Sequence, residues 1–314
     1  MIQIQRALAT AAIATTFVIG ACKGDGSTDD VTSNKSMAVM STYAEYYNEM
    51  IKTVPDMIKN YMSRVGDGEK IGEKEFKMMG LACMGSPLDV AKVKASLEKA
   101  KKESTGEFKD LPPLAEAMFE AGKSISETRA ELCKNVKAED YKDDGGAKAN
   151  ELHKKLVALV PQWSKATGEM SAALDKFEDQ QALSQIKKYE GDKDDSYWFR
   201  FFNLKAKSMI RAVETGPDRV APAADELLKA SEELDAFAKG KGDKLNAAFK
   251  AYVDRAEDFA TDTKKLRRDV GAEEDAAKKA KLVDKARNGF ISDYNTLISL
   301  SDSLMSLEAS KVLK

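Results

Sequence analysis

The stretch ELHKKLVALVPQWSKATGEMSAALDKFEDQQALSQI, Glu151–Ile186, is the longest helical pattern in the sequence. Its apolar residues recur mostly at intervals of three, four or seven, which places them on one face of a helix. Because proline removes a backbone donor, the pattern predicts either one long helix or two helices joined near Pro161. The members of the stripe are Leu152, Leu156, Leu159, Trp163, Met170, Leu174, Phe177 and Ile186.

The same periodicity recurs on both sides of this stretch. An upstream stripe runs from Tyr43 to Val65 across Pro55, which should kink or restart the helix. Ser86 as a cap and Pro87 in the first turn predict another helix start. No segment alternates with the period of two that marks a strand, so we expect an all-α antiparallel bundle of long amphipathic helices. Further helices are expected over about 113–136, 197–214, 223–238, 244–270 and 273–313.

The first residues have the pattern of an export signal. A single basic residue, Arg6, precedes an apolar run over 7–21 that is too short to span a membrane comfortably. The sequence Ile19-Gly20-Ala21-Cys22 resembles the lipobox of bacterial lipoproteins, in which a cysteine receives the lipid. This resemblance implies a signal peptide at 1–21 and acylation of Cys22, for example by palmitate, which anchors the protein to a membrane.

The anchor should be followed by a tether and then the folded region. Residues 22–36 are polar and contain glycine, so we expect a flexible tether and a helical bundle domain over 37–314. Lys23 stands where an aspartate would resemble an inner-membrane retention signal. The expected location is therefore the bacterial envelope, on the periplasmic face of the outer membrane.

Cys83 and Cys133 remain after Cys22 is assigned to the lipid. An even number of cysteines in an oxidising compartment predicts a disulfide that closes a loop of about 50 residues. Two buried free thiols are the alternative, since the sequence does not show how close the two residues lie.

Composition and residue types argue against several classes of function. The formal net charge of −2 lacks the concentrated positive field that nucleic acid requires. His153 is the only histidine, which excludes a multi-histidine metal site, and no nucleophile motif accompanies it. We expect it to be a helix-surface or partly buried residue that donates one hydrogen bond. No enzyme activity, cofactor or metal is predicted.

The segment EDYKDDGGAKANEL, Glu139–Leu152, has some features of a calcium loop. When Gly145 is aligned with the required glycine, Lys142 occupies a position where an oxygen ligand belongs. We therefore interpret Asp143, Asp144 and the glycines as a turn and helix start, with the acids near the positive end of the helix dipole.

Two kinds of segment are candidates for binding. The aromatic run YWFRFFNL at 197–204 predicts core packing, with an apolar pocket between helices as the sharper hypothesis. The basic clusters at 263–269 and 99–103 are typical of solvated helix ends, with contact to anionic lipid or cell-wall polymer as the alternative. The candidate pocket residues are Trp198, Phe201, Phe202 and Met209.

The central segment also resembles the YiiG-like family of bacterial lipoproteins, a domain of unknown function. The similarity is strongest over Tyr141–Trp163 and continues into Tyr197–Val213. It implies an all-helical envelope lipoprotein and carries over no catalytic residues. The matching motif residues are Tyr141, Asp143, Asp144, Lys148, Leu152 and His153.

These features favour a non-enzymatic, lipid-anchored helical domain that binds an envelope protein, the cell wall or a small molecule. The second hypothesis is a periplasmic carrier that holds an apolar molecule or lipid between helices. An enzyme without a recognisable motif is the third. The partner, oligomeric state and physiological process are not specified by the sequence.

Overall fold

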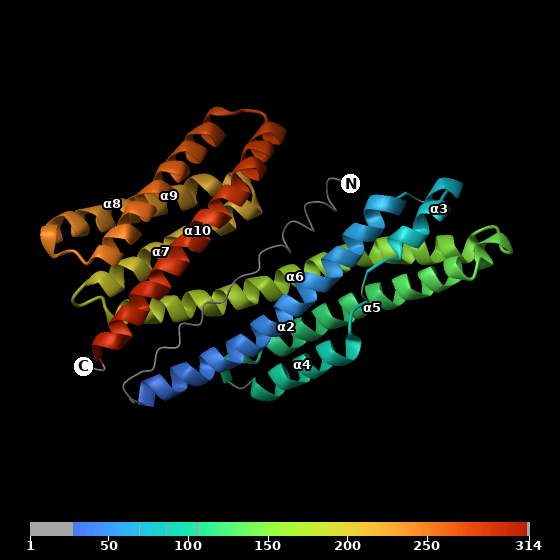
Figure 1. Cartoon of the computed structure of the whole chain (residues 1–314), viewed down its shortest axis with the longest axis horizontal. Helices are drawn as coiled ribbons and strands as arrows, with labels where there is room; N and C mark the ends of the chain where they lie inside the picture. Colours follow the sequence, from blue (N-terminus) through green and yellow to red (C-terminus); the bar gives the residue numbers. More distant parts are fainter. Residues whose placement is uncertain (1–27, 69, 86, 105, 313–314) are drawn as a thin grey trace. The chain divides into compact units, whose positions relative to one another are not determined.

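The computed structural model describes residues 28–312 apart from 69, 86 and 105. Within these residues the chain forms nine α-helices and no strands, which confirms the all-α prediction (Figure 1). Three short 3-10 helices, η1 (Gly106–Phe108), η2 (Asp140–Lys142) and η3 (Gly242–Lys244), lie between them. The α-helices are α2 (Thr28–Val65), α3 (Glu73–Ala82), α4 (Val90–Glu103), α5 (Leu111–Lys137), α6 (Ala147–Lys188), α7 (Asp195–Thr215), α8 (Pro217–Lys241), α9 (Ala247–Ala272) and α10 (Ala276–Val312).

The described chain divides into two compact units. Unit 1 extends to Lys176 and unit 2 begins at Phe177, so the division falls inside α6. The sequence-based prediction of one helical bundle domain over 37–314 stays a prediction, and the two units are compact parts within that range. The periodicity gave no sign of the division because it continues through the boundary without a break.

Unit 1 is built around α2, which packs against α3, α4 and α5. The first part of α6 joins this core, where Trp163 is buried. Gly122 of α5 lies where three helices converge, since a Cβ there would stand 2.6 Å from Met50 and 3.0 Å from Trp163. Glycine thus permits the close approach of α5 to its neighbours.

Unit 2 contains a four-helix bundle. α7 packs against α8, α8 against α9 and α9 against α10, and α10 also packs against α7. Phe202, Phe249, Tyr252 and Phe259 are fully buried between these helices. Short connections and antiparallel neighbours are what a bundle of this kind requires.

Several helix boundaries differ from the prediction. Both Pro55 and Pro161 lie inside continuous helices, so α6 is a single helix of 42 residues. α2 begins at Thr28, which makes part of the predicted tether helical. Helix α3 occupies a segment in which no helix was predicted, and α4 begins at Val90. Its cap is Asp89, whose carboxylate accepts a 3.0 Å hydrogen bond from the backbone of Lys92.

No described helix combines the length and apolar character needed to cross a membrane.

Candidate functional site

The predicted signal peptide, 1–21, and the predicted lipidation residue, Cys22, lie outside the described residues. Cys22 therefore stays a sequence-based prediction. The remaining candidate residues are all described.

Cys83 and Cys133 form the predicted disulfide, with the sulfurs 2.02 Å apart and the Cα atoms 5.7 Å apart. The bond joins α5 to the residue that ends α3. Arg129 supports the same junction, because its Nη2 donates to the carbonyls of Ala82 (3.1 Å) and Met84 (2.7 Å). Burial lowers the pKa of the Arg129 guanidinium. The end of α3 is thus held by one covalent bond and two hydrogen bonds.

His153 is buried and uses both ring nitrogens, whereas the sequence predicted a helix-surface or partly buried residue that donates one hydrogen bond. Its side chain is 1% exposed. Nε2 lies 2.7 Å from the carbonyl of Gly68, and Nδ1 lies 2.7 Å from the Tyr61 hydroxyl. Because a carbonyl can only accept, Nε2 carries the proton and Nδ1 accepts from Tyr61. Burial raises the pKa of Tyr61, which keeps this hydroxyl protonated as a donor.

Asp144 caps the start of α6. Its two carboxylate oxygens accept from the backbone of Lys148 (2.9 Å) and Gly146 (2.8 Å). These bonds hold the pKa of the Asp144 carboxyl below its ordinary value. The predicted turn and helix start are therefore present, and both carboxylate oxygens of Asp144 accept from backbone donors.

The other family-motif residues lie around the same helix start. Tyr141 stacks on Phe76 of α3 with ring centroids 4.6 Å apart. Lys148 lies 3.5 Å from carboxylates of Glu131 and Glu151. Leu152 is buried in the cluster that joins α2, α3, α5 and α6, whereas Asp143 is exposed. The motif thus describes one structural junction of unit 1.

Asn150 belongs to this junction although the motif omitted it. Its Oδ1 accepts from the backbone of Ile71 (2.6 Å), and its Nδ2 donates to the carbonyl of Gly146 (2.8 Å). A polar residue in a helix gives no sequence signal that it will fix a distant connection, so sequence reasoning missed it.

The four candidate pocket residues lie in the core of unit 2. Phe202 and Met209 are fully buried, and Trp198 is 7% exposed. Trp198 makes an edge contact with Phe201 and a tilted contact with Phe237, at centroid distances of 6.1 and 5.7 Å. Neighbouring protein side chains thus surround them, as core packing predicts, and binding of an apolar ligand stays a prediction.

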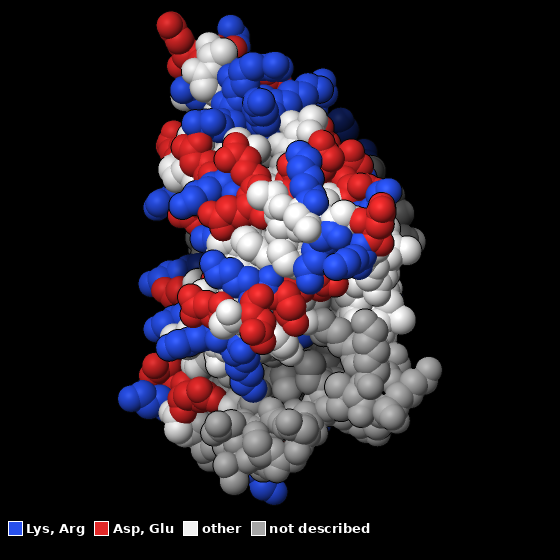
Figure 2. Space-filling model, turned by 90° about the vertical axis from the view of Figure 1, so that its left-hand side faces the viewer, with Lys and Arg blue, Asp and Glu red and all other residues white. Residues whose placement is uncertain are grey.

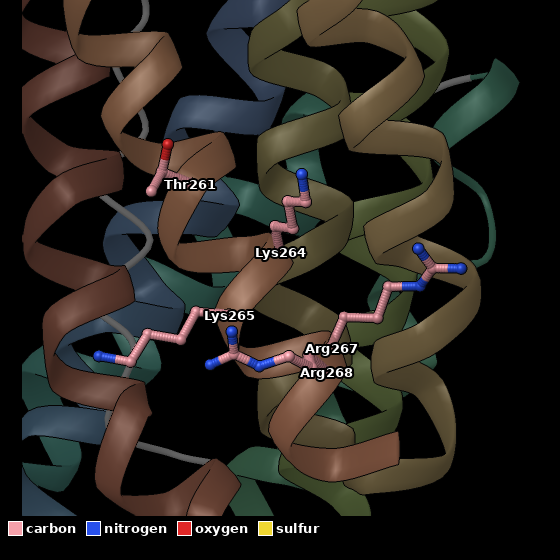
Figure 3. A pocket seen from close by; sticks show the side chains of 5 residues that line it. All are labelled: Thr261, Lys264, Lys265, Arg267 and Arg268. Atoms are coloured by element: carbon pink, nitrogen blue, oxygen red, sulfur yellow. The ribbon is translucent and has the colours of Figure 1, made fainter. Parts of the chain in front are cut away.

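A hollow of about 540 Å³ on α9 is lined by basic side chains. Its residues are Thr261, Lys264, Lys265, Arg267 and Arg268 (Figure 3). Lys265 and Arg268 extend to one side of α9, and Arg267 extends to the other. Figure 2 shows one face of the molecule, where basic and acidic side chains are intermixed over much of the surface and basic ones gather toward the top.

This cluster is not a helix end, which corrects one part of its interpretation. α9 continues to Ala272, and its last turn contains no basic residue. Favourable interaction with the helix dipole falls off beyond the last turn. The predicted helix ended at about 270, which placed Arg267 and Arg268 in its last turn, whereas α9 ends at Ala272.

Metal-ligating residues are dispersed in the described chain. Among the described residues, no group of three or more histidine, cysteine, aspartate or glutamate side chains is placed to hold a metal ion.

The architecture defines a two-unit, all-helical protein in which α6 belongs to both units. The chain belongs to the family described as protein of unknown function (DUF3829), whose model matches residues 35–301. No curated protein and no solved structure matches the chain. The expected membership of a family of unknown function is thus confirmed, while the narrower resemblance to YiiG-like lipoproteins stays a prediction.

Proposed function

We propose that this protein is a lipid-anchored, non-catalytic binding protein of the bacterial envelope. In this proposal Cys22 carries the lipid, and the two helical units present their surfaces to a partner at the periplasmic face of the outer membrane. The anchor rests on the likeness of Ile19–Cys22 to a lipobox.

One observation supports the proposal that the protein is not an enzyme: the side chains of its histidine and of two of its cysteines are already bonded within the protein. His153 is the only histidine of the chain, and both of its nitrogens are bonded to protein groups. Cys83 and Cys133 are consumed in a disulfide. Since a nucleophile or general base must be free to meet a substrate, these residues are better suited to holding the fold.

The carrier alternative has less support. Its proposed pocket residues, including Phe202 and Met209, are buried against other side chains of unit 2. Native mass spectrometry of the protein from its own host would test it, because a retained non-protein mass beyond the anchor would favour a carrier.

Metabolic labelling with a palmitate analogue tests the anchor. We expect the label on the wild-type chain and its loss in Cys22→Ala, whereas Cys83→Ala with Cys133→Ala should keep it. Label that persisted in Cys22→Ala would contradict the proposed anchor.

Crosslinking in living cells tests the binding role. Photoreactive residues at exposed positions of each unit should give the same partner repeatedly from one unit. Random products from both units would count against a specific binding surface.

A further inference from the structure

Residues 264–285 of unit 2 run from the second half of α9 into α10 and hold eight lysines and arginines against five carboxylates. α9 contributes the hollow described above, and the first turns of α10 contribute exposed Lys278, Lys281 and Lys285. The two helices pack against each other and are joined by a short connection, so residues 264–268 and 278–285 lie at similar levels along the hairpin. We call these residues the basic surface: Lys264, Lys265, Arg267, Arg268, Lys278, Lys281 and Lys285.

The nearby carboxylates form no described ion pair with the lysines of the basic surface. Glu273 and Glu274 lie in the connection between α9 and α10, where a Glu273 oxygen accepts from the backbone of Glu274 and Asp275. Asp225 pairs with Arg267 at 2.6 Å, and Asp269 pairs with Arg268 at 3.0 Å. Asp275 accepts from the backbone of Lys278 as the cap of α10. Asp284 pairs with Arg287 at 2.7 Å.

Five lysines are consequently left without a carboxylate. Within the part of the chain that the structure describes, none of them forms an ion pair. These residues are Lys264, Lys265, Lys278, Lys281 and Lys285.

Helix stability does not explain where these cations lie. Lys278 is in the first turn of α10, at the positive end of the helix dipole, where a cation is unfavourable. Lys264 and Lys265 precede the last turn of α9. An interaction with an external anion would account for a cation placed against the dipole.

The chemistry of the basic surface fits phosphate better than nucleic acid bases. Lysine and arginine donate charge-assisted hydrogen bonds to phosphate oxygens, and the Thr261 hydroxyl adds a neutral donor. The hollow has no aromatic lining residue on which a base could stack. The basic surface as a whole extends over the exposed sides of α9 and α10, which suits an array of headgroups more than a single enclosed ligand.

We propose that the basic surface docks on the phosphate groups of an anionic lipid membrane. This inference does not depend on acylation of Cys22, because it concerns residues of α9 and α10 alone. Docking would hold unit 2 against a bilayer surface by electrostatic attraction that salt screens.

The test uses the full chain associated with vesicles, whether through the lipid on Cys22 or through the retained apolar run at 7–21. An amine-acylating reagent is added, and mass spectrometry follows the rate at each lysine. On vesicles containing phosphatidylglycerol, Lys264, Lys265 and Lys278 should react roughly fivefold more slowly than on neutral phosphatidylcholine. High salt should abolish the protection.

Lys99 and Lys102 of α4 provide the internal control, because they are also exposed lysines in a basic helical cluster. Their rates should differ little between the two vesicles. The double variant Lys264→Gln with Lys265→Gln should remove the protection of Lys278 against acylation on phosphatidylglycerol vesicles. The control variant Lys99→Gln with Lys102→Gln removes the same charge and should leave Lys278 protected.

Two results would overturn the proposal. Equal protection of the α4 and α9 lysines would show a general surface effect. Protection by inorganic phosphate on neutral vesicles, as strong as that by phosphatidylglycerol, would identify a free-anion site instead of a membrane-docking surface.

Discussion

The two units of this protein stabilise similar helical cores by different means. Unit 1 relies on a disulfide and buried polar contacts around the irregular connections on either side of α3. Unit 2 joins regular helices by short connections and fills its interior with aromatic side chains. The difference shows that connections, more than helices, determine where a helical protein needs covalent or polar links.

The aromatic core of unit 2 contains few polar contacts. Tyr252 is fully buried, and its hydroxyl donates to the Phe199 carbonyl (3.1 Å) or to Oδ1 of Asn203 (2.8 Å). Nδ2 of Asn203 in turn donates to the Ser301 hydroxyl at 2.6 Å. Burial raises the pKa of Tyr252 well above its ordinary value, so its hydroxyl stays protonated and can donate at neutral pH. One such network suffices where apolar packing supplies most of the stability.

The stability of each unit can be measured separately because each unit contains one of the two tryptophans. Trp163 lies in unit 1 and Trp198 in unit 2, and both are buried. In a Trp198→Phe background fluorescence reports on unit 1, and in a Trp163→Phe background it reports on unit 2. Denaturant titration of each background then gives the effect of a substitution on each unit separately.

Removal of the disulfide should have the largest effect. Cys83→Ala with Cys133→Ala should destabilise unit 1 by about 4 kcal/mol, because the unfolded chain loses the closure of a long loop. The Trp163 transition should shift to lower denaturant while the Trp198 transition moves little. Reduction of the wild-type protein should give the same shift, and an equal shift of both transitions would contradict the assignment of the bond to unit 1.

A cavity in the aromatic core of unit 2 should have the second largest effect on stability. Met209→Ala removes a fully buried side chain of α7 and should destabilise unit 2 by about 3 kcal/mol. Met78→Ala is the matched control, since Met78 is 38% exposed on α3 and its loss should change stability by less than about 0.5 kcal/mol. If the Trp163 transition responded more than the Trp198 transition, the separation of the two cores would be wrong.

The buried hydrogen bond of His153 should contribute less. Tyr61→Phe leaves Nδ1 of His153 without its donor and should cost unit 1 about 2 kcal/mol. Tyr141→Phe is the control, because that hydroxyl has no described hydrogen bond while its ring would keep the stacking on Phe76. Similar transitions for the two variants would show that the Tyr61 hydroxyl contributes nothing beyond its ring.

The cap at the start of α6 should have the smallest effect, and that effect should depend on pH. Backbone bonds from Lys148 and Gly146 lower the folded-state pKa of Asp144 below its unfolded value. The stabilisation is therefore present above the unfolded pKa and is lost as pH falls through the folded pKa. Asp144→Ala should lower the melting temperature at neutral pH, and the difference from wild type should shrink in acid.

Asp143→Ala is the matched control for the cap. Asp143 is exposed and its side chain has no described hydrogen bond, so its removal should have little effect at any pH. A difference between Asp144→Ala and wild type that stayed constant from neutral to acidic pH would argue against a role for the charged carboxylate.

Periodicity and local chemistry made most of the helices predictable. The stripe that includes Trp163 and Leu174 specified α6, and the even number of cysteines left after Cys22 predicted the disulfide. Asp144 was recognised as part of a helix start because its capping partners are close in sequence. These features depend on neighbours within a few residues or on a residue type with few alternatives.

Contacts between residues far apart in the sequence could not be predicted in the same way. The partners of His153 lie far from it in sequence, at Tyr61 and Gly68. The unpaired state of Lys264 and Lys278 depends on which carboxylates the fold brings near them. Neither the burial of a single histidine nor the balance of charge on a surface is fixed by residue order alone.

The course of α6 has a further consequence for how the protein can be divided. Most domain boundaries fall in exposed linkers, where the chain can be cut without loss of hydrogen bonds. Here the boundary between Lys176 and Phe177 lies within a continuous helix. A cut there would leave up to four carbonyls and four amide groups of the helix without their partners. The two units are therefore poor candidates for recombination as exchangeable modules, and gene fusions or circular permutations should tolerate breaks near Gly191 or Gly242 better than a break at this boundary.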